Sequence, residues 1–111
     1  MSEPTDDTPV LDLLAQLTAD SVDASSLDTR TLVLVRLAAL VAVDAPPVSY
    51  LTNLEAAAEV GVDADQVAGV LTAVAPIVGT PRVIAAADGI AESLALEIAV
   101  ALVDAEEQNE A

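Results

Sequence analysis

The amino-acid sequence predicts an all-α protein that folds as a single domain of about five helices. Two observations carry this prediction. Proline, glycine and capping residues recur between apolar segments, as they do where helices start and stop. No segment shows the apolar–polar alternation or the Asn-Gly turns that indicate β-hairpins. With 111 residues, the chain is long enough for one domain with a hydrophobic core.

The first predicted helix begins at Thr8 and Pro9, because a capping residue followed by proline is typical of a first turn. Apolar residues follow at helical spacing, at Val10, Leu13, Leu14 and Leu17. Residues 19–26 are rich in Ser, Asp and Ala, and we expect them to form a polar connector. Asp28 then caps a second helix, in which nearly every position over 32–43 is apolar. We therefore expect this second helix to be buried all round.

The third predicted helix follows a pair of prolines, Pro46 and Pro47. Proline breaks a helix interior but is tolerated in a first turn, so this pair ends one helix and starts the next. The third helix is expected to run to about Val60. Gly61 then fits the position after a helix where the backbone turns left-handed.

A capping box formed by Asp63 and Gln66 predicts the start of the fourth helix. That helix continues to about Val78. A Gly-Thr-Pro joint at 79–81 ends it and caps a fifth helix, expected over about 82–103.

Acidic residues crowd both ends of the chain, which sets the expected domain boundaries. We expect a flexible acidic N-terminus at 1–7, a helical domain at 8–104 and an acidic tail at 105–111. We interpret both acidic ends as solvated surface rather than as recognition tails.

The predicted core contains one aromatic residue, Tyr50, so Ala, Val, Leu and Ile must supply the rest. Small side chains bury little area each, and each Å² of apolar surface contributes only roughly 25 cal/mol. The chain therefore gains by covering apolar faces with copies of itself, and we expect a homo-oligomer. Arg30 and Arg82 fall in first turns of helices, where we expect surface or inter-subunit ion pairs.

The net charge of −16, with three arginines and no lysine, argues against nucleic acid or an anionic membrane as partner. The longest apolar stretch, 32–43, contains Arg36 and is shorter than the ~20 residues that a bilayer span requires. The acidic start of the chain is unlike a secretory signal. We therefore expect a cytoplasmic protein.

The chain contains neither histidine nor cysteine. Histidine is the usual general base near neutral pH, and cysteine is the usual redox thiol. Without cysteine, disulfides, thiolate metal sites and thiol peroxidase activity are excluded, because serine cannot cycle through a sulfenic acid. We expect no cofactor.

Several short motifs follow one another in a recognisable order and spacing. They are Leu-Asp-x-Arg-Thr at 27–31 with the apolar run after it, Ala-Pro-Pro at 45–47, Gly-Val at 61–62 and Ala-Pro-x-x-Gly-x-Pro at 75–81. In these motifs the chain resembles the carboxymuconolactone decarboxylase family, which includes alkylhydroperoxidase D. The resemblance implies an all-helical subunit that assembles as trimers or hexamers.

The resemblance also locates the family's chemistry, in a short stretch before the glycine that matches Gly61. Redox members carry Cys-x-x-Cys-x-x-x-His there, and the decarboxylases keep the histidine. The histidine position falls on Asn53, the cysteine positions on Pro46 and Ser49, and a frequent glutamate on Val33. Asn53 cannot exchange a proton near neutral pH, but its amide donates and accepts hydrogen bonds. A ligand can therefore bind where the family's substrate would.

Arg36 interrupts an apolar helix, so its guanidinium must reach water or a carboxylate. We favour a structural ion pair over a clamp for an organic acid, although arginine is the usual partner of carboxylates. The candidate ligand pocket consists of Arg36, Ser49, Tyr50 and Asn53.

Two acidic pairs at helical spacing are candidate metal ligands: Glu55 with Glu59, and Asp88 with Glu92. Four facing carboxylates can hold Mg²⁺ or Ca²⁺. We favour solvated helix faces, because the histidines of bundle di-metal sites are missing. No metal site is predicted.

We favour a catalytically degenerate family member that acts as an oligomeric scaffold or a small-ligand-binding protein. The alternative is an enzyme of the same fold, decarboxylase-like and acting on a small organic acid or lactone, that uses Tyr50, Asn53, Arg36 and a carboxylate. A third interpretation is an acyl carrier-like protein, because Asp-Ser-Val around Ser21 is similar to the Asp-Ser-Leu of acyl carriers.

Overall fold

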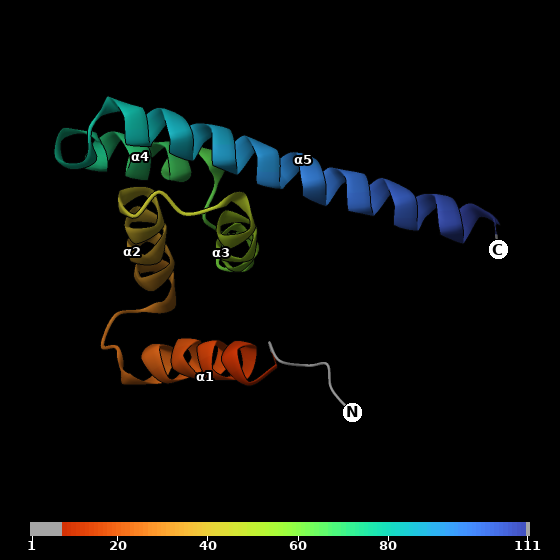
Figure 1. The fold of residues 1–111 in the computed structure, drawn as a ribbon, viewed down its shortest axis with the longest axis horizontal. Coiled ribbons are helices and arrows are strands. Elements are labelled where there is room, and N and C mark those ends of the chain that lie inside the picture. The colour runs from red at the N-terminus through yellow and green to blue at the C-terminus, as the bar shows by residue number, and fades with distance from the viewer. Residues whose placement is uncertain (1–7, 111) are drawn as a thin grey trace.

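A computed structural model of the chain describes residues 8–110, and over this range it confirms the all-α prediction (Figure 1). Side chains are described through residue 95 and at 102, 103 and 105. The predicted N-terminal segment 1–7 and the last residue of the predicted tail, 111, lie outside the described residues. The helices are α1 (Thr8–Ala24), α2 (Thr29–Ala42), α3 (Pro47–Glu59), α4 (Ala64–Val78) and α5 (Thr80–Glu110).

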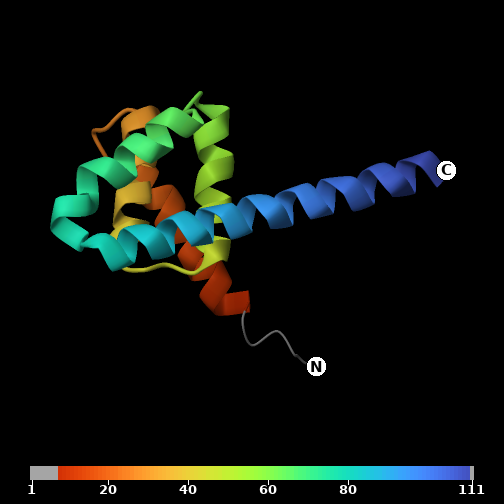
Figure 2. The same ribbon diagram turned by 90° about the horizontal axis from the view of Figure 1, so that it is seen from above.

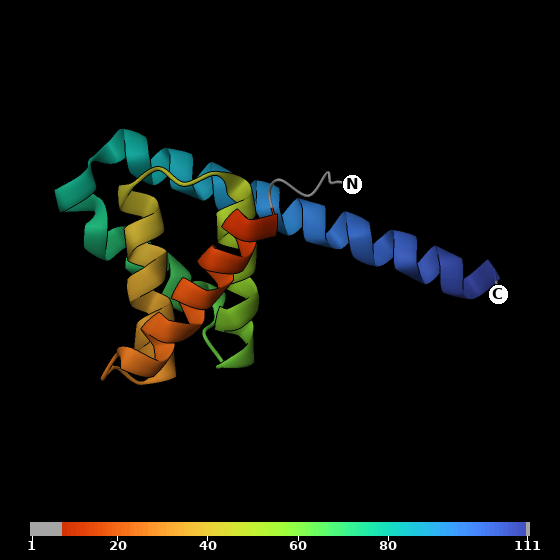
Figure 3. The same cartoon turned by 60° about the horizontal axis from the view of Figure 1, so that its bottom comes forward.

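The helices stack in three layers (Figure 1). α2 and α3 form the middle layer, and α4 packs on α2 while α5 packs mainly on α3. α1 crosses α2 and α3 on the side opposite α4 and α5 (Figures 1 and 3). The C-terminal half of α5 extends past the bundle, which Figure 2 shows most clearly.

The hydrophobic core is centred on Tyr50, whose side chain is 1% exposed. Its buried neighbours come from α2 and α5: Leu37, Val41 and Ala86. Partly buried α4 residues pack against them, at Val67, Val70, Leu71 and Val74. Aliphatic side chains therefore surround one aromatic ring, as the composition predicts.

The predicted capping residues form the expected hydrogen bonds. Asp28 accepts from the Thr31 backbone N–H at 2.8 Å, and hydrogen bonds from the Thr31 amide and hydroxyl lower the pKa of this carboxyl group. Asp63 accepts from the Gln66 N–H at 2.8 Å, and the Gln66 side chain accepts in return from the Asp63 N–H at 3.0 Å. Gly61 takes a φ of 78° after α3. Local chemistry therefore sets these helix ends.

Two predicted boundaries are wrong because helix continues through them. α1 extends to Ala24, so most of the predicted connector at 19–26 is helical. The Gln16 side chain donates to the Asp20 carboxylate at 2.9 Å, one turn away, and supports the helix there. α5 runs from Thr80 to Glu110 rather than over 82–103, because no proline follows Pro81 to stop it.

The expectation that 32–43 is buried all round is also wrong. Val35 is 51% exposed and Val43 is 70% exposed. The buried positions lie on the side of α2 that meets the core, at Leu32, Val33, Leu37 and Val41. The opposite side faces α1, which crosses it without burying any residue of its own. Arg36, Ala39 and Leu40 of α2 line the pocket described below, whereas the exposed Val35 and Val43 lie outside that lining.

Arg30 caps the end of another helix within the same chain. Its Nη1 donates to the Val60 carbonyl at 3.0 Å, just beyond the last turn of α3. A cation at a helix C-terminus balances the partial negative charge of the unpaired carbonyls. Within the described part of the chain, Arg30 therefore caps a helix in place of the expected surface ion pair, and an inter-subunit pair stays a prediction. Arg82, in the first turn of α5, is exposed.

Replacing Arg30 with methionine tests this cap, because it keeps a long apolar side chain and removes the donor. We expect Arg30→Met to lower the free energy of unfolding by about 1 kcal/mol, through loss of a charge-assisted hydrogen bond. Arg82→Met is the control, with an expected change within about 0.5 kcal/mol. Urea unfolding followed by circular dichroism at one protein concentration measures both. Equal effects of the two substitutions would contradict the capping role.

Gly89 marks the closest approach of α5 to the core. A β-carbon there would lie 3.2 Å from Cε2 and 3.3 Å from Cδ2 of Tyr50, whose ring is enclosed. We therefore expect Gly89→Ala to destabilise the fold by about 1 kcal/mol, because overpacking outweighs the gain in helix propensity.

Gly69, in α4, is the matched control for this substitution. A β-carbon there meets nothing within 4 Å. Gly69→Ala should therefore stabilise the fold by about 0.5–1 kcal/mol in the same unfolding assay. Equal stabilisation of the two alanine variants would contradict the close contact between Tyr50 and α5.

Candidate functional site

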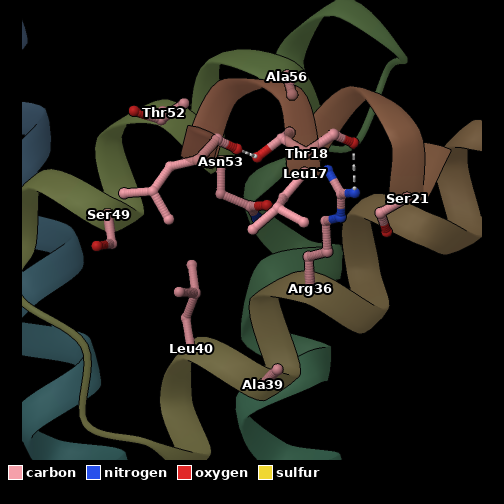
Figure 4. Close-up of a pocket in the computed structure, with 11 residues that line it drawn as sticks. Leu17, Thr18, Ser21, Arg36, Ala39, Leu40, Ser49, Thr52, Asn53 and Ala56 are labelled. Atoms are coloured by element: carbon pink, nitrogen blue, oxygen red, sulfur yellow. Dashed lines mark hydrogen bonds between the residues drawn. The ribbon is translucent and has the colours of Figure 1, made fainter. Parts of the chain in front are cut away.

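A pocket of about 540 Å³ lies between α1, α2 and α3 (Figure 4). Its volume falls within the roughly 300–1,000 Å³ typical of small-molecule sites. Its wall combines leucine and alanine side chains with residues that carry hydroxyl, amide or guanidinium groups. The lining residues are Leu14, Leu17, Thr18 and Ser21 of α1, Arg36, Ala39 and Leu40 of α2, and Ser49, Thr52, Asn53 and Ala56 of α3.

Three of the four sequence-predicted pocket residues come together here: Arg36, Ser49 and Asn53. Ser49 and Asn53 are one helical turn apart on α3, so both point to the same side of that helix. Arg36 lines the same pocket from α2, and in Figure 4 its guanidinium lies beside Thr18 while Ser49 lies at the other end. Two helices therefore supply the polar groups that the sequence placed in one site.

Tyr50, the fourth predicted pocket residue, does not line the pocket. Consecutive residues of a helix point about 100° apart, and Tyr50 points into the core while Ser49 points toward α1. Burial raises the pKa of the Tyr50 phenol, and the negative charge of Asp44 adds to this rise. Its Oη has no hydrogen-bond partner among the described residues. Tyr50 is therefore a neutral core residue, separated from Arg36 and Asn53.

Arg36 does not form the ion pair that its place in an apolar helix predicts. Within the described residues, its Nη2 donates to the Thr18 backbone carbonyl at 3.2 Å, which ties α2 to α1. Asp20, the acidic residue two positions beyond Thr18, accepts instead from Gln16 on its own helix. The eleven lining residues include no Asp or Glu. Arg36 is therefore the one charged residue in the pocket wall.

Asn53 and Val33 are neighbours across the α2–α3 contact. The Asn53 Nδ2 donates to the Val33 carbonyl at 3.5 Å, the long limit of a hydrogen bond. The Val33 side chain is 4% exposed and packs in the core. The family resemblance assigns a histidine and a glutamate to these positions, and the fold places them side by side.

The predicted pocket did not include the α1 residues, two further α2 residues (Ala39 and Leu40) or two further α3 residues (Thr52 and Ala56). Ser49, Thr52, Asn53 and Ala56 follow i, i+3, i+4, i+7 spacing, so one face of α3 could have been identified as a unit. The α1 residues carried a weaker signal. Their periodicity indicates an apolar face, but it does not say which helix that face meets.

The other candidate sites have little support in the structure. Glu55, Glu59, Asp88 and Glu92 are all exposed. Over the described residues, no group of three or more potential ligands is placed to hold a metal ion.

Ser21, the residue of the acyl carrier comparison, lies inside α1 and lines the pocket. No helix in the described range combines the length and apolar character needed to cross a membrane.

Comparison with known proteins gives one assignment. The carboxymuconolactone decarboxylase family model matches residues 9–93. This range begins in the first turn of α1 and ends within α5, so it includes all the helices that line the pocket. Searches of curated proteins and of solved structures found no match. The chain therefore belongs to the carboxymuconolactone decarboxylase family.

Proposed function

We propose that this chain is a catalytically degenerate member of its family that binds a small organic ligand between α1, α2 and α3. One observation carries the proposal: Arg36, Ser49 and Asn53 converge on a pocket of about 540 Å³. Two of these residues occupy positions where, by family resemblance, the catalytic cysteine and histidine would stand. The chain has a cavity at these positions but lacks the cysteine and the histidine that would react in it.

The chemistry of the pocket wall supports binding without turnover. The charged residue of the lining is Arg36, whose guanidinium carries N–H donors and no acceptor. The hydroxyl groups of Ser21, Ser49 and Thr52 have no histidine or carboxylate beside them in the lining to act as a base. Tyr50, which an enzyme of this fold would need under the alternative interpretation, lies in the core. The wall therefore offers hydrogen bonds and charge but no proton acceptor.

Filling the pocket tests the proposal. Native mass spectrometry of the full chain purified from its own cell should show a retained small molecule. Ala39→Trp places a large ring in the pocket wall and should abolish this retention, because the added side chain occupies the ligand's space. Ala73→Trp, at an exposed position of α4 outside the lining, is the control and should keep it.

Two results would contradict the proposal. One is a native protein that retains no small molecule in the mass spectrum and binds no small organic molecule added to it. The other is turnover of a carboxylated muconolactone by the purified chain alone, which would show that the pocket is catalytic.

We further propose that the chain assembles as a homo-oligomer, a trimer or hexamer as the family resemblance implies, and that α1 forms part of the interface. No residue of α1 is buried within the single chain. Three of its apolar residues that lie outside the pocket lining are each more than half exposed: Val10, Leu11 and Leu13. Isolated helices of this length are marginal in water and depend on packing of an apolar face. A second copy supplies that packing.

Polar substitutions on α1 test this assembly. Leu11 and Leu13 do not line the pocket, so Leu11→Gln combined with Leu13→Gln should reduce the oligomer to monomers. Ile77→Gln is the control, because Ile77 is 86% exposed but lies on α4. Size-exclusion chromatography with light scattering gives the mass of each. A native chain that stays monomeric at high concentration would rule out the assembly.

A further inference from the structure

We infer that the ligand of this pocket is a monocarboxylic acid with an apolar body, held with its carboxylate on Arg36. This inference rests on the proposed ligand binding and adds the chemical class of the ligand. Three features of the pocket lead to it: the sign of its charge, the geometry of its one cation and the nature of its walls.

The charged group in the pocket lining is positive, whereas the net charge of the chain is negative. The chain carries a net charge of −16, yet the lining includes Arg36 and no acidic residue. A ligand anion entering the pocket therefore meets a cation and no carboxylate in the wall. A ligand amine would find no charged partner there, and its desolvation would not be compensated. Charge complementarity thus favours an anionic ligand.

The guanidinium of Arg36 is held along the pocket wall. Its Nη2 donates to the Thr18 carbonyl at 3.2 Å, which fixes the direction of the side chain. A guanidinium has five N–H donors in a planar fork, so this bond leaves donors for a carboxylate. In Figure 4 the Ser21 hydroxyl lies beside Arg36 and provides a further polar group at the same end. The site is therefore organised for one carboxylate before any ligand arrives.

The rest of the wall suits a hydrocarbon better than a second charge. It carries no charged residue: five of its side chains are leucine or alanine, and the others are the uncharged polar residues of α1 and α3. The apolar ones are Leu14, Leu17, Ala39, Leu40 and Ala56, and the polar ones are Thr18, Ser49, Thr52 and Asn53. Leu14 is 52% exposed and Leu17 is 54% exposed, although both line the pocket. An apolar ligand body covers these side chains and removes their surface from water. A dicarboxylate would bury its second charge against uncharged groups, with no second cation in the lining.

Side-chain NMR of the native chain tests the inference directly, because it contains three arginines and therefore gives three Nε–Hε signals. Octanoate is the probe. Octan-1-ol keeps its chain length without a charge, octylamine carries the opposite charge, and succinate carries two carboxylates on a shorter chain. We expect octanoate to shift the Arg36 signal and to leave those of Arg30 and Arg82 in place. Octan-1-ol should bind more weakly, and octylamine and succinate should not saturate the site.

Substitution of the arginine separates charge from packing. Arg36→Met should weaken octanoate binding by at least about tenfold and leave octan-1-ol binding unchanged, because a charge-assisted hydrogen bond is lost. Arg36→Lys keeps the charge and should retain part of the affinity, with a stronger dependence on salt than the native chain. Arg82→Met, far from the pocket lining, is the control and should bind octanoate as the native chain does.

The possible outcomes distinguish this inference from the proposed function. Octanoate binding that survives Arg36→Met in a folded variant, or a preference for octylamine or succinate, overturns the carboxylate assignment. If octanoate fails to bind but the native protein retains a neutral or cationic molecule, the inference fails and the proposed function stands. If octanoate fails and nothing is retained, both fail. Should Arg36→Met not fold, the lysine variant and the three comparison ligands decide the matter.

Discussion

The contact between the Tyr50 ring and the backbone at Gly89 joins α3 to α5, and the orientation of α3 depends on it. The ring is the only aromatic group of the chain and fills the centre of an otherwise aliphatic core. Because it points toward α5, the side of α3 with Ser49 and Asn53 must point toward α1. The close packing of Tyr50 against α5 and the open pocket thus lie on two sides of α3.

Features set by residues close in sequence were predicted correctly. The cap at Asp28 and the capping box at Asp63 join groups three residues apart, so their chemistry is visible without the fold. Features set by packing between distant helices were not predicted correctly. The open side of α2 and the partner of Arg30 depend on where distant helices lie, and short-range patterns do not contain that information.

The candidate site was predicted in part for the same reason. The family resemblance selected Ser49 and Asn53 by their spacing before a glycine turn, and Arg36 stood out as a charge in an apolar helix. Tyr50 is adjacent in sequence to Ser49, but adjacent residues of a helix point in different directions. The wall supplied by α1 needed the crossing of that helix over α2 and α3, which only the fold shows.

The burial of Tyr50 also determines what optical spectroscopy can report on this molecule. With no tryptophan in the chain, Tyr50 is the sole strong chromophore in the near ultraviolet. Its ring is enclosed by the core and lies on the far side of α3 from the pocket. Near-ultraviolet circular dichroism and intrinsic fluorescence therefore follow the integrity of the α3–α5 contact. We expect these Tyr50 signals not to change when a ligand occupies the cavity, so they report folding alone during a ligand titration.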